Sequence, residues 1–493
     1  MKTFVQLLKW MAIGGGVLVA LAVVFVCEEN WRGAHTWAQY RTQLEKQGFG
    51  FTVEAIRPKP VPESQNFATS PLLRPLFDYE VDRETGQERL RDESAKEKIE
   101  PSSTTVKALF KPAQFGNFRT AEVVDLDSAK CAQILQALSQ YEPQMREIAT
   151  NARRPFAVYP VRYEDGVSMK VGFLSVLQGF IGAYDLRAKA EIGVGQMEAA
   201  KADVETILRI AGKCQNPSIL ISGLVRNAFL ICALEPMWIG LQRHGWSEAQ
   251  LAEMQQMLAG IDVIRLSIVD LRTEMESVPM GEKTLTALPL DKRKSMLTFW
   301  REDELAEFLE MLPITGWIDQ NTAFQLRWEQ ERTLKELDPV TSRVFPKKVE
   351  ADIAAANALQ TTPYNFRARQ SLAVISTCNR RTAMAAQYVK LAEIGCALER
   401  YRLVHHEYPE ALANLVPEFM AKLSSDVCTG EPLHYRRETT ASYRLWSVGW
   451  DLLDDDGVAK TSDSGVFDSL HGDWVWKIPN PASDTTENGN SKS

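Results

Sequence analysis

The sequence lacks the short motifs that identify most enzyme active sites. It contains no Gly-x-Ser-x-Gly elbow, no phosphate-binding loop, no Gly-x-Gly-x-x-Gly, no His-Glu-x-x-His and no kinase signature, each of which marks a defined catalytic or nucleotide site. Histidine is scarce, with 6 residues, and the adjacent pair His405 and His406 ends a helical run. Neighbouring side chains diverge around a helix, so this pair cannot easily share a metal. We predict no catalytic residues, and the sequence favours a protein that is not an enzyme.

Paired cysteines are also missing. The 7 cysteines are widely scattered and form no Cys-x-x-Cys, which gives no support to a zinc ribbon or a thioredoxin-like redox site. Most of them lie within apolar helical patterns, where a reduced cysteine behaves as a small hydrophobic residue. We expect at most one or two disulfides.

The chain has no excess of positive charge. With 64 acidic and 56 basic residues, its net charge is -8, whereas nucleic-acid binding depends on clustered lysine and arginine. Nucleic acid is therefore not an expected partner.

The hydrophobic fraction of 45% and the charged fraction of 24% are typical of globular proteins, which excludes wholesale disorder and a polytopic membrane protein. A length of 493 residues predicts more than one folding unit.

One long hydrophobic run is present, near the N-terminus. Trp10–Cys27 is an uncharged stretch of 18 residues, close to the ~20 that cross a bilayer as a helix. Lys2 and Lys9 precede it and two glutamates follow it, so the positive-inside rule keeps the N-terminus in the cytoplasm. We predict that residues 1–29 form a single-pass anchor in the cytoplasmic (inner) membrane and that the bulk of the chain is extracytoplasmic.

A cleaved signal peptide is the alternative interpretation of this run. Ala20-Leu21-Ala22 supplies the small residues of a cleavage site. Cleavage there leaves the strongly apolar Val23–Cys27 at the new N-terminus, which favours the uncleaved anchor.

Residues 30–127 are predicted to form a juxtamembrane helix followed by a proline-rich and charged linker. The membrane helix either continues outward or restarts, because aromatic and apolar residues recur at helical spacing, at Trp31, Trp37, Tyr40 and Leu44. The prolines of residues 57–62 predict an extended spacer. Apolar groups in residues 66–77 are expected to pack on the helical body downstream. Charge dominates residues 80–100, which predicts a solvated loop.

Helical periodicity prevails over residues 128–365, which we predict to be a helical domain. Asp127-Ser128 is a plausible N-cap, Pro217-Ser218 opens an apolar helix, and Gly245–Glu248 resembles a turn and cap. Glu274 and Glu276 lie two residues apart and are expected to point to different faces of a solvated helix.

A pair of helices in this domain has two interpretations. Tyr184–Glu191, a turn at Gly195, and a second helix through Ala199 and Ile207 resemble a degenerate tetratricopeptide (TPR-like) unit. Such arrays need about three neighbouring repeats to bury their faces, and one is visible. Ordinary helical-hairpin packing is the favoured alternative.

Residues 366–479 differ from the rest in their pattern of apolar residues, which combines one long helix with alternating, strand-like segments. Arg367–Tyr401 has the apolar pattern of one long helix, and Pro432–Arg436 and Ser442–Val448 alternate like paired antiparallel strands. Residues 480–493 are rich in Ser, Asn and Asp and are predicted to be a disordered tail. The predicted fold class is mainly α with a small α+β C-terminal module: an N-terminal transmembrane helix, a helical-hairpin body, and a long helix packed on an antiparallel sheet.

The C-terminal quarter contains a distinctive series of residues: Ala397–Arg402, Tyr408-Pro409, Leu412, Leu415–Pro417, Asp426, Thr429-Gly430, Pro432-Leu433, Tyr435, Tyr443–Gly449 and Asp451. In the order and spacing of these residues it resembles the soluble domain of type II secretion major pseudopilins. In those proteins the membrane helix leads directly into this module, whereas here the preceding helix is internal.

A second pattern lies in the N-terminal part, at Asn30–Gly33, Trp37, Tyr40, Leu44, Val61-Pro62 and Asn66–Ala68. In these residues the chain is similar to uncharacterised membrane-anchored proteins of planctomycete and verrucomicrobial type. This likeness implies no activity.

An aspartate-rich loop follows the pseudopilin-like strands. In the resembling pseudopilins a loop after the Ser-x-Gly-x-Asp strand holds calcium, and the resemblance implies this role for Asp451 and, less directly, for Asp473. Crowded carboxylates also need an offset to their mutual repulsion, and Ca²⁺ prefers oxygen ligands. We predict a calcium site at Asp451, Asp454, Asp456 and Asp473; the alternative is a solvated acidic turn.

Two classes of function stay open. The first is a membrane-anchored, extracytoplasmic interaction or scaffold protein without enzymatic activity, whose partners are proteins of the cell envelope or a secretion assembly. The second is an extracytoplasmic hydrolase with an acidic cleft in the helical body, since catalytic carboxylates usually come from distant elements. A concave pocket that holds two carboxylates with perturbed titration favours the second class. The sequence identifies no small-molecule substrate.

Overall fold

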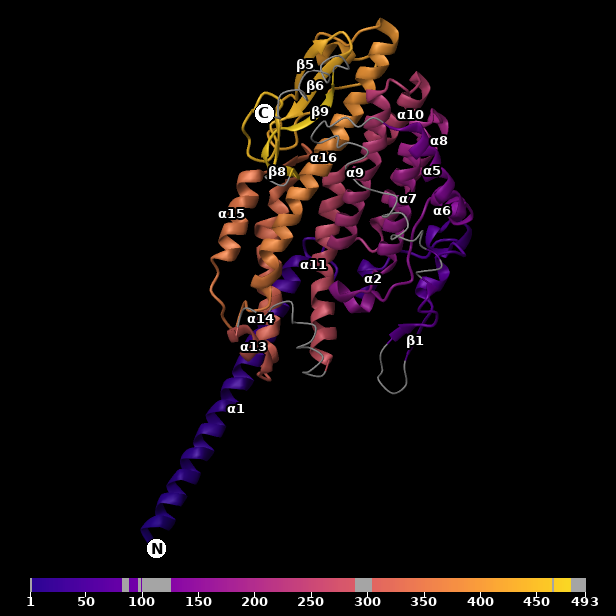
Figure 1. Ribbon diagram of the computed structural model, residues 1–493. Coiled ribbons are helices and arrows are strands. Elements are labelled where there is room, and N and C mark those ends of the chain that lie inside the picture. The colour runs from indigo at the N-terminus through magenta and orange to yellow at the C-terminus, as the bar shows by residue number, and fades with distance from the viewer. Residues whose placement is uncertain are drawn as a thin grey trace, which may run out of the picture.

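The computed structural model describes residues 2–81, 88–95, 99, 126–288, 304–462 and 465–479. Figure 1 shows a long helix that projects from a bundle of helices, with small strands at the opposite end of the bundle. This arrangement confirms the predicted fold class, mainly α with a small C-terminal sheet region. The predicted tail, residues 480–493, and part of the predicted charged loop lie outside the described residues.

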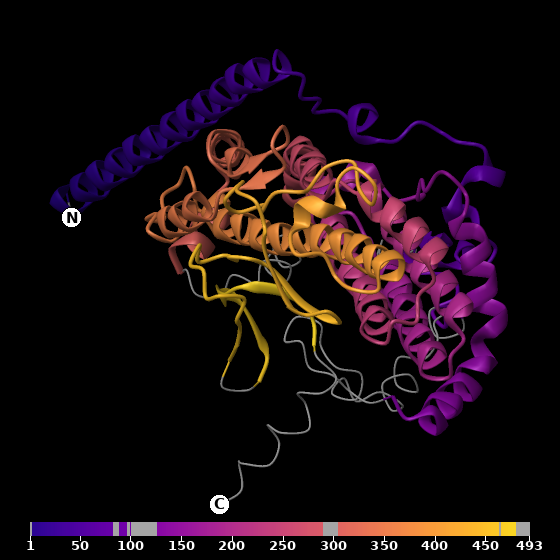
Figure 2. The same ribbon diagram turned by 90° about the horizontal axis from the view of Figure 1, so that it is seen from above.

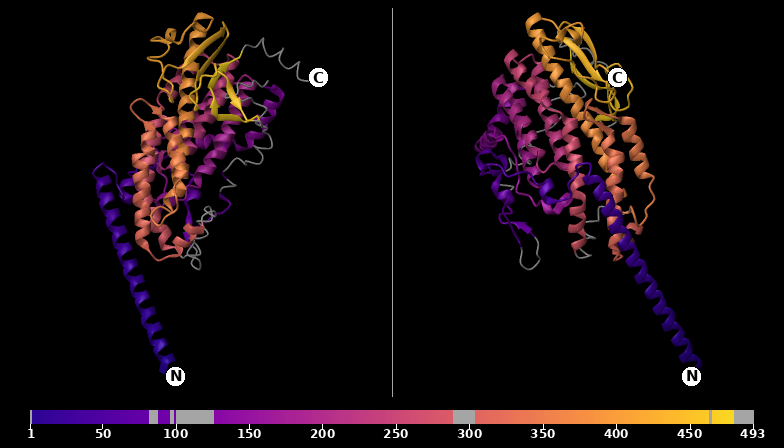
Figure 3. Two further views of the ribbon diagram at one scale, coloured as in Figure 1. Left: turned by 90° about the vertical axis from the view of Figure 1, so that its left-hand side faces the viewer. Right: turned by 180° about the vertical axis from the view of Figure 1, so that it is seen from behind.

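The N-terminal helix, α1, is continuous from Lys2 to Glu45. It therefore continues outward past the apolar stretch, the first of the two predicted alternatives. Its N-terminal half projects away from the bundle (Figures 1 and 3), and its most apolar 18 residues are 0% buried. A second helix, α9 (Leu220–Gln242), is also long and apolar enough to cross a membrane, but it is largely buried inside the bundle.

The second half of α1 packs against α14 (Thr315–Glu331). The two backbones approach closely, because a Cβ on Gly33 would lie 2.0 Å from the carbonyl oxygen of Gly316. Beside this crossing, the Trp317 indole N–H donates to the buried carboxylate of Glu29 at 2.8 Å. The body is thus attached to α1 directly after its apolar stretch.

The segment after α1 runs along the helical body. Residues 58–62 are neither helix nor strand, as the prolines predict. Phe67, Leu73 and Leu76 are buried in the main hydrophobic cluster, which confirms that this segment packs on the body. Its regular elements are α2 (Val53–Ile56), β1 (Tyr79–Val81) and β2 (Glu88–Leu90), and the two strands pair antiparallel.

The body is a bundle of helices. Among the described residues they are α5 (Ser128–Leu138), α6 (Glu142–Ala152), α7 (Phe173–Gly193), α8 (Met197–Gly212), α9, α10 (Glu248–Ala259), α11 (Val263–Ala287), α13 (Glu304–Met311), α14 and α15 (Pro346–Asn357). The short strands β3 (Leu337–Asp338) and β4 (Arg343–Val344) pair between α14 and α15. Helices α7 and α8 form a hairpin whose turn holds Gly195 at a φ of +80°, a left-handed conformation that glycine adopts without strain.

Two of the three predicted helix starts are confirmed. The Asp127 carboxylate caps α5, and Ser247 forms a capping box with Gln250 at the start of α10. The third start is shifted, because α9 begins at Leu220 and not at Ser218. The Ser218 hydroxyl donates instead to the carboxylate of Asp270 on α11 at 2.8 Å, so a long-range contact replaces the expected local cap.

The C-terminal region is built on α16 (Ala368–His405). A three-stranded antiparallel sheet packs on it in the order β5 (His434–Thr439), β6 (Ser442–Ser447), β9 (Trp474–Ile478), and β7 (Ala459–Thr461) pairs with β8 (Phe467–Gly472). Leu445 of β6 stands opposite Trp476 of β9, and a Cβ on Gly395 of α16 would lie 2.7 Å from the Trp476 indole nitrogen. The predicted long helix and the predicted strands therefore share one core.

Helix α16 also belongs to the helical body. Seen from above, it crosses the middle of the molecule with the C-terminal strands on one side (Figure 2). Its other sides contact α9, α10 and α15, and the Trp238 indole of α9 donates to the carbonyl of Lys477 at 2.9 Å. One hydrophobic cluster includes residues of both regions.

Candidate functional site

The predicted calcium ligand Asp473 is fully buried beside the aspartate-rich loop. Its carboxylate accepts backbone N–H groups from Asp455, Gly457 and Val458, the bond from Gly457 being 2.7 Å long. Burial raises the pKa of Asp473 to about 6, against the opposing effect of these hydrogen bonds. The structure thus brings Asp473 and the loop together, as the calcium prediction requires.

The other three predicted ligands do not converge with Asp473 on one point. Asp451 accepts the N–H groups of Leu453 and Gly472, Asp454 accepts from the Trp446 indole at 3.0 Å, and Asp456 pairs with Arg436 at 2.9 Å. The residues described here include no group of three or more His, Cys, Asp or Glu side chains that could hold a metal ion. Calcium binding by this loop stays a prediction.

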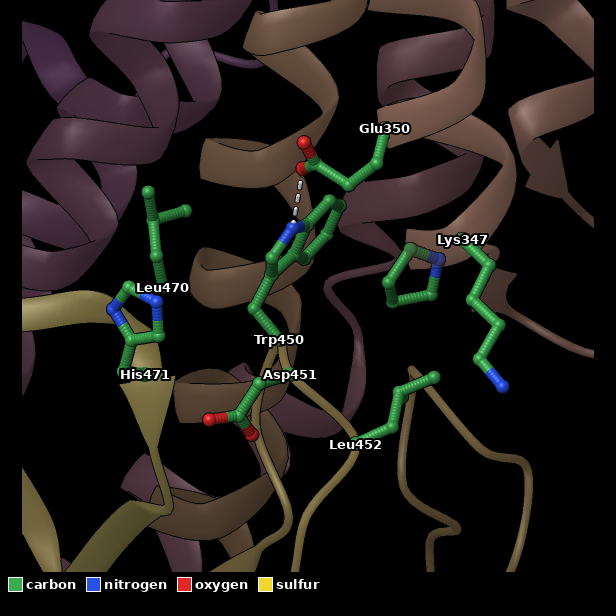
Figure 4. A pocket seen from close by; sticks show the side chains of 8 residues that line it. Lys347, Glu350, Trp450, Asp451, Leu452, Leu470 and His471 are labelled. Atoms are coloured by element: carbon green, nitrogen blue, oxygen red, sulfur yellow. Dashed lines mark hydrogen bonds between the residues drawn. The ribbon is translucent and has the colours of Figure 1, made fainter. Parts of the chain in front are cut away.

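A hollow of about 430 Å³ lies between the start of α15 and the turn after β6. Figure 4 shows Trp450 beneath Glu350, whose carboxylate accepts the indole N–H at 2.7 Å, with Asp451 on the same side as His471. Burial raises the pKa of Glu350, but hydrogen bonds from Arg380 and Trp450 outweigh it and hold the pKa below its usual value. Glu350, Asp451 and His471 in this hollow already have hydrogen-bond partners, and we assign the hollow no chemistry.

A larger cavity of about 640 Å³ lies between α11, α13, α14 and α16. Its walls are mainly apolar. The described lining residues that carry charge are four glutamates and one arginine: Glu274, Glu282, Glu307, Glu310 and Arg367. In Figure 1 these helices meet at the end of the bundle from which the exposed half of α1 departs.

Arg367 forms ion pairs with two of the glutamates. Its guanidinium donates to Glu310 through Nε at 2.8 Å and through a second nitrogen, and its remaining nitrogen donates to Glu282. The side chain is 8% exposed. Burial raises the pKa of Glu282, and the charge of Arg367 opposes this rise. Arg367 therefore ties α11 to α13 at the point where α16 begins.

Glu274 corrects the expectation of a solvated helix face. Its Oε2 accepts the N–H of Leu220 at 3.0 Å. Burial, together with the charge of Asp270, raises the pKa of Glu274 to about 7, and the hydrogen bond from Leu220 opposes this rise. The physical reason is that α11 is covered on more than one side. The spacing of Glu274 from Leu271 and Val278, three and four residues, already puts it on the apolar stripe, a signal that the sequence interpretation missed.

Glu329 of α14 is a buried carboxylate whose charge interacts with that of Glu274 on the cavity wall. It is 2% exposed and accepts a hydrogen bond from Gln325 at 2.8 Å. Burial raises its pKa to about 8, with a contribution from the charge of Glu274. In the part of the chain that the structure describes, no cation pairs with either carboxylate. Sequence reasoning gave Glu329 no role.

Comparison with protein-family models, curated proteins and solved structures finds no match to this chain. Inference about its function therefore rests on its own geometry and chemistry.

Proposed function

We propose that the chain is a single-pass protein of the cytoplasmic membrane that holds a helical body outside the cytoplasm and acts by binding partners of the cell envelope. The observation that carries this proposal is the division of α1. The most apolar 18 residues of this helix are 0% buried, whereas the turns that follow are packed into the body. Such a stretch is stable when a bilayer covers it, and Lys2 and Lys9 favour a cytoplasmic N-terminus.

The C-terminal region is the proposed docking surface for such partners. Helix α16 with the sheet β5-β6-β9 is compatible with the resemblance to pseudopilin soluble domains. It lies at the end of the molecule opposite to the exposed half of α1 (Figure 1). A module held away from the membrane surface is accessible to a secretion or envelope assembly.

Membrane fractionation tests the anchor. Replacement of Leu18 and Val24 by lysine puts two charges in the apolar stretch, each costing about 3 kcal/mol on insertion scales, and is expected to release the protein from membranes. The matched control replaces Val340 and Val466, exposed on the body, by lysine and is expected to stay in the membrane. A wild-type chain that fractionates as soluble contradicts the proposal.

A hydrolase is the second candidate, and the cavity is the observation that favours it. Glu274, with its pKa near 7, has the property of a general acid at neutral pH. The test is hydrolysis of a panel of ester, peptide and glycoside substrates. Activity that is lost in Glu274→Gln and kept in Glu276→Gln supports this candidate. Activity that is absent from the wild type, or equal in both variants, removes it.

A further inference from the structure

We propose that the cavity between α11, α13, α14 and α16 binds a single-chain amphiphile with a protonated amine head, drawn from the outer surface of the membrane. The source of this ligand rests on the proposed membrane anchor, whereas the binding chemistry rests on the cavity alone. Three independent features of the cavity, its shape, its charge and its position, lead to this ligand class.

The shape and lining of the cavity suit an apolar chain. Its volume of about 640 Å³ lies within the range of small-molecule sites, which are mostly apolar with a few polar groups that fix orientation. Side chains from α9, α11, α16 and the turn before α16 supply apolar parts of the wall. They include Leu220, Val278, Leu285, Phe366 and Ile375.

The charge of the cavity selects a cationic head. Arg367 is already bound by Glu282 and Glu310. Glu274 receives one N–H from the backbone of Leu220, and the described residues place no cation beside it. An ionised carboxylate in an apolar cavity is costly unless it is paired. An ammonium group brings a positive charge and three donors, whereas a fatty-acid carboxylate is repelled.

The position of the cavity points to the bilayer as the source. Ala306 and Phe366 line the cavity and also belong to a hydrophobic cluster that packs against Val26, inside the apolar stretch of α1. On its outer side α13 exposes three large apolar side chains at helical spacing, Leu305, Phe308 and Met311, as do helices that lie in a membrane interface. Val374, 59% exposed, also lines the cavity and marks its open side.

The test uses the full chain in phosphatidylcholine nanodiscs, titrated with decylamine, decanol or decanoate while thermal unfolding is followed. Decylamine is expected to raise the Tm saturably, because a ligand that binds the folded state stabilises it. Decanol and decanoate are expected to have no saturable effect. Equal shifts with decanoate or decanol overturn the proposal.

Two variants locate the effect. Glu274→Gln is expected to raise the decylamine concentration at the midpoint of the titration about tenfold, because one charged hydrogen bond is lost. The control is Glu276→Gln, since the wild-type Glu276 carboxylate accepts the N–H of Gly50. This control is expected to keep the wild-type midpoint. An unchanged midpoint in Glu274→Gln overturns the proposal. If that variant does not fold, Val374→Trp, at the exposed rim, narrows the entrance and is expected to weaken binding; an unchanged midpoint there overturns it equally.

The nanodisc experiment can distinguish a failure of the cavity proposal from a failure of the proposed membrane anchor. A chain that does not enter nanodiscs contradicts the anchor, and the same titration in water, with decylamine below its micelle concentration, then still tests the cavity. A chain that enters nanodiscs but does not respond to decylamine keeps the anchor and overturns the cavity proposal.

Discussion

Among single residues, two neighbouring carboxyl groups have no cation beside them in the described part of the chain, Glu329 in the interior and Glu274 on the wall of the cavity. Glu329 and Glu274 have pKa values raised to about 8 and about 7, in each case chiefly by burial. Buried carboxyl groups are stable when they are protonated. With no cation bound beside them, these two groups therefore hold protons near neutral pH that the unfolded chain releases.

Glu329→Gln is expected to change how stability depends on pH. Because the folded pKa of Glu329 is raised from 4.5 to about 8, its contribution to stability is fully present below about pH 4.5 and is lost as the pH rises through about 8. The wild-type Tm should fall between pH 5 and 8. The Tm of the glutamine variant should fall less over this range. At pH 8 the variant should be more stable than the wild type, by about 1 to 3 kcal/mol in the free energy of unfolding.

The control for this experiment is Glu331→Gln, at an exposed position of the same helix. It should follow the wild-type pH profile. Parallel profiles for Glu329→Gln and the wild type contradict a protonated Glu329.

Calcium binding by the aspartate-rich loop is tested on the full chain. If the predicted site forms, millimolar calcium raises the Tm and a chelator lowers it. At a calcium concentration a few-fold above the Kd, the expected gain in the free energy of unfolding is about 1 kcal/mol. Asp451→Ala should respond less than the wild type. An identical response removes Asp451 from the site, and no response in either protein leaves the acidic turn as the explanation.

At the scale of elements, α1 serves two environments along one continuous helix. Its first half is apolar and exposed, and its second half crosses α14 at Gly33 and Gly316. The crossing depends on the absence of side chains there. Since Glu29 and Trp317 are hydrogen-bonded beside it, the helix pair sets the orientation of the body relative to the apolar stretch.

Gly316→Ala is expected to destabilise the protein, although alanine normally favours a helix. Its Cβ would lie 2.1 Å from the carbonyl oxygen of Glu29, so α1 and α14 must separate, at a cost of about 1 to 3 kcal/mol. The matched control is Gly182→Ala in α7, where a Cβ meets no atom within 4 Å. That change should stabilise the protein by about 0.5 to 1 kcal/mol. Thermal unfolding of both variants should show a lower Tm for Gly316→Ala and a higher Tm for Gly182→Ala than for the wild type. Equal changes in Tm contradict the close crossing of α1 and α14.

The elements that the sequence predicted correctly are those fixed by local chemistry. The caps at Asp127 and Ser247 bond N–H groups at most three residues away, so their patterns are complete in the sequence. The start of α9 was placed wrongly because Ser218 bonds Asp270, 52 residues away. Glu274 is a different case, because its spacing from Leu271 and Val278 already indicates the apolar stripe of α11. What the sequence could not show is that this side of the helix lines a cavity, which depends on the packing of other helices.

At the scale of the whole molecule, α16 joins the parts that the sequence divided. It contributes to one hydrophobic cluster with α9 and with the C-terminal strands. The proposed boundary near residue 366 therefore falls at the start of a helix whose sides face both regions. Periodicity predicted the helix and its length, but it could not tell how many partners surround it.

The proposed anchor requires that α1 spans the cytoplasmic membrane and holds the body outside. A phosphatase reporter that is active only outside the cytoplasm, fused after Ser493, shows on which side of the membrane the body lies. We expect an active reporter on a membrane-bound protein, and lower activity when Lys2 and Lys9 are replaced by glutamate, because the charge bias that orients the helix is removed. An inactive reporter on a stable, full-length fusion, or an active one on a chain free of the membrane, rules the anchor out.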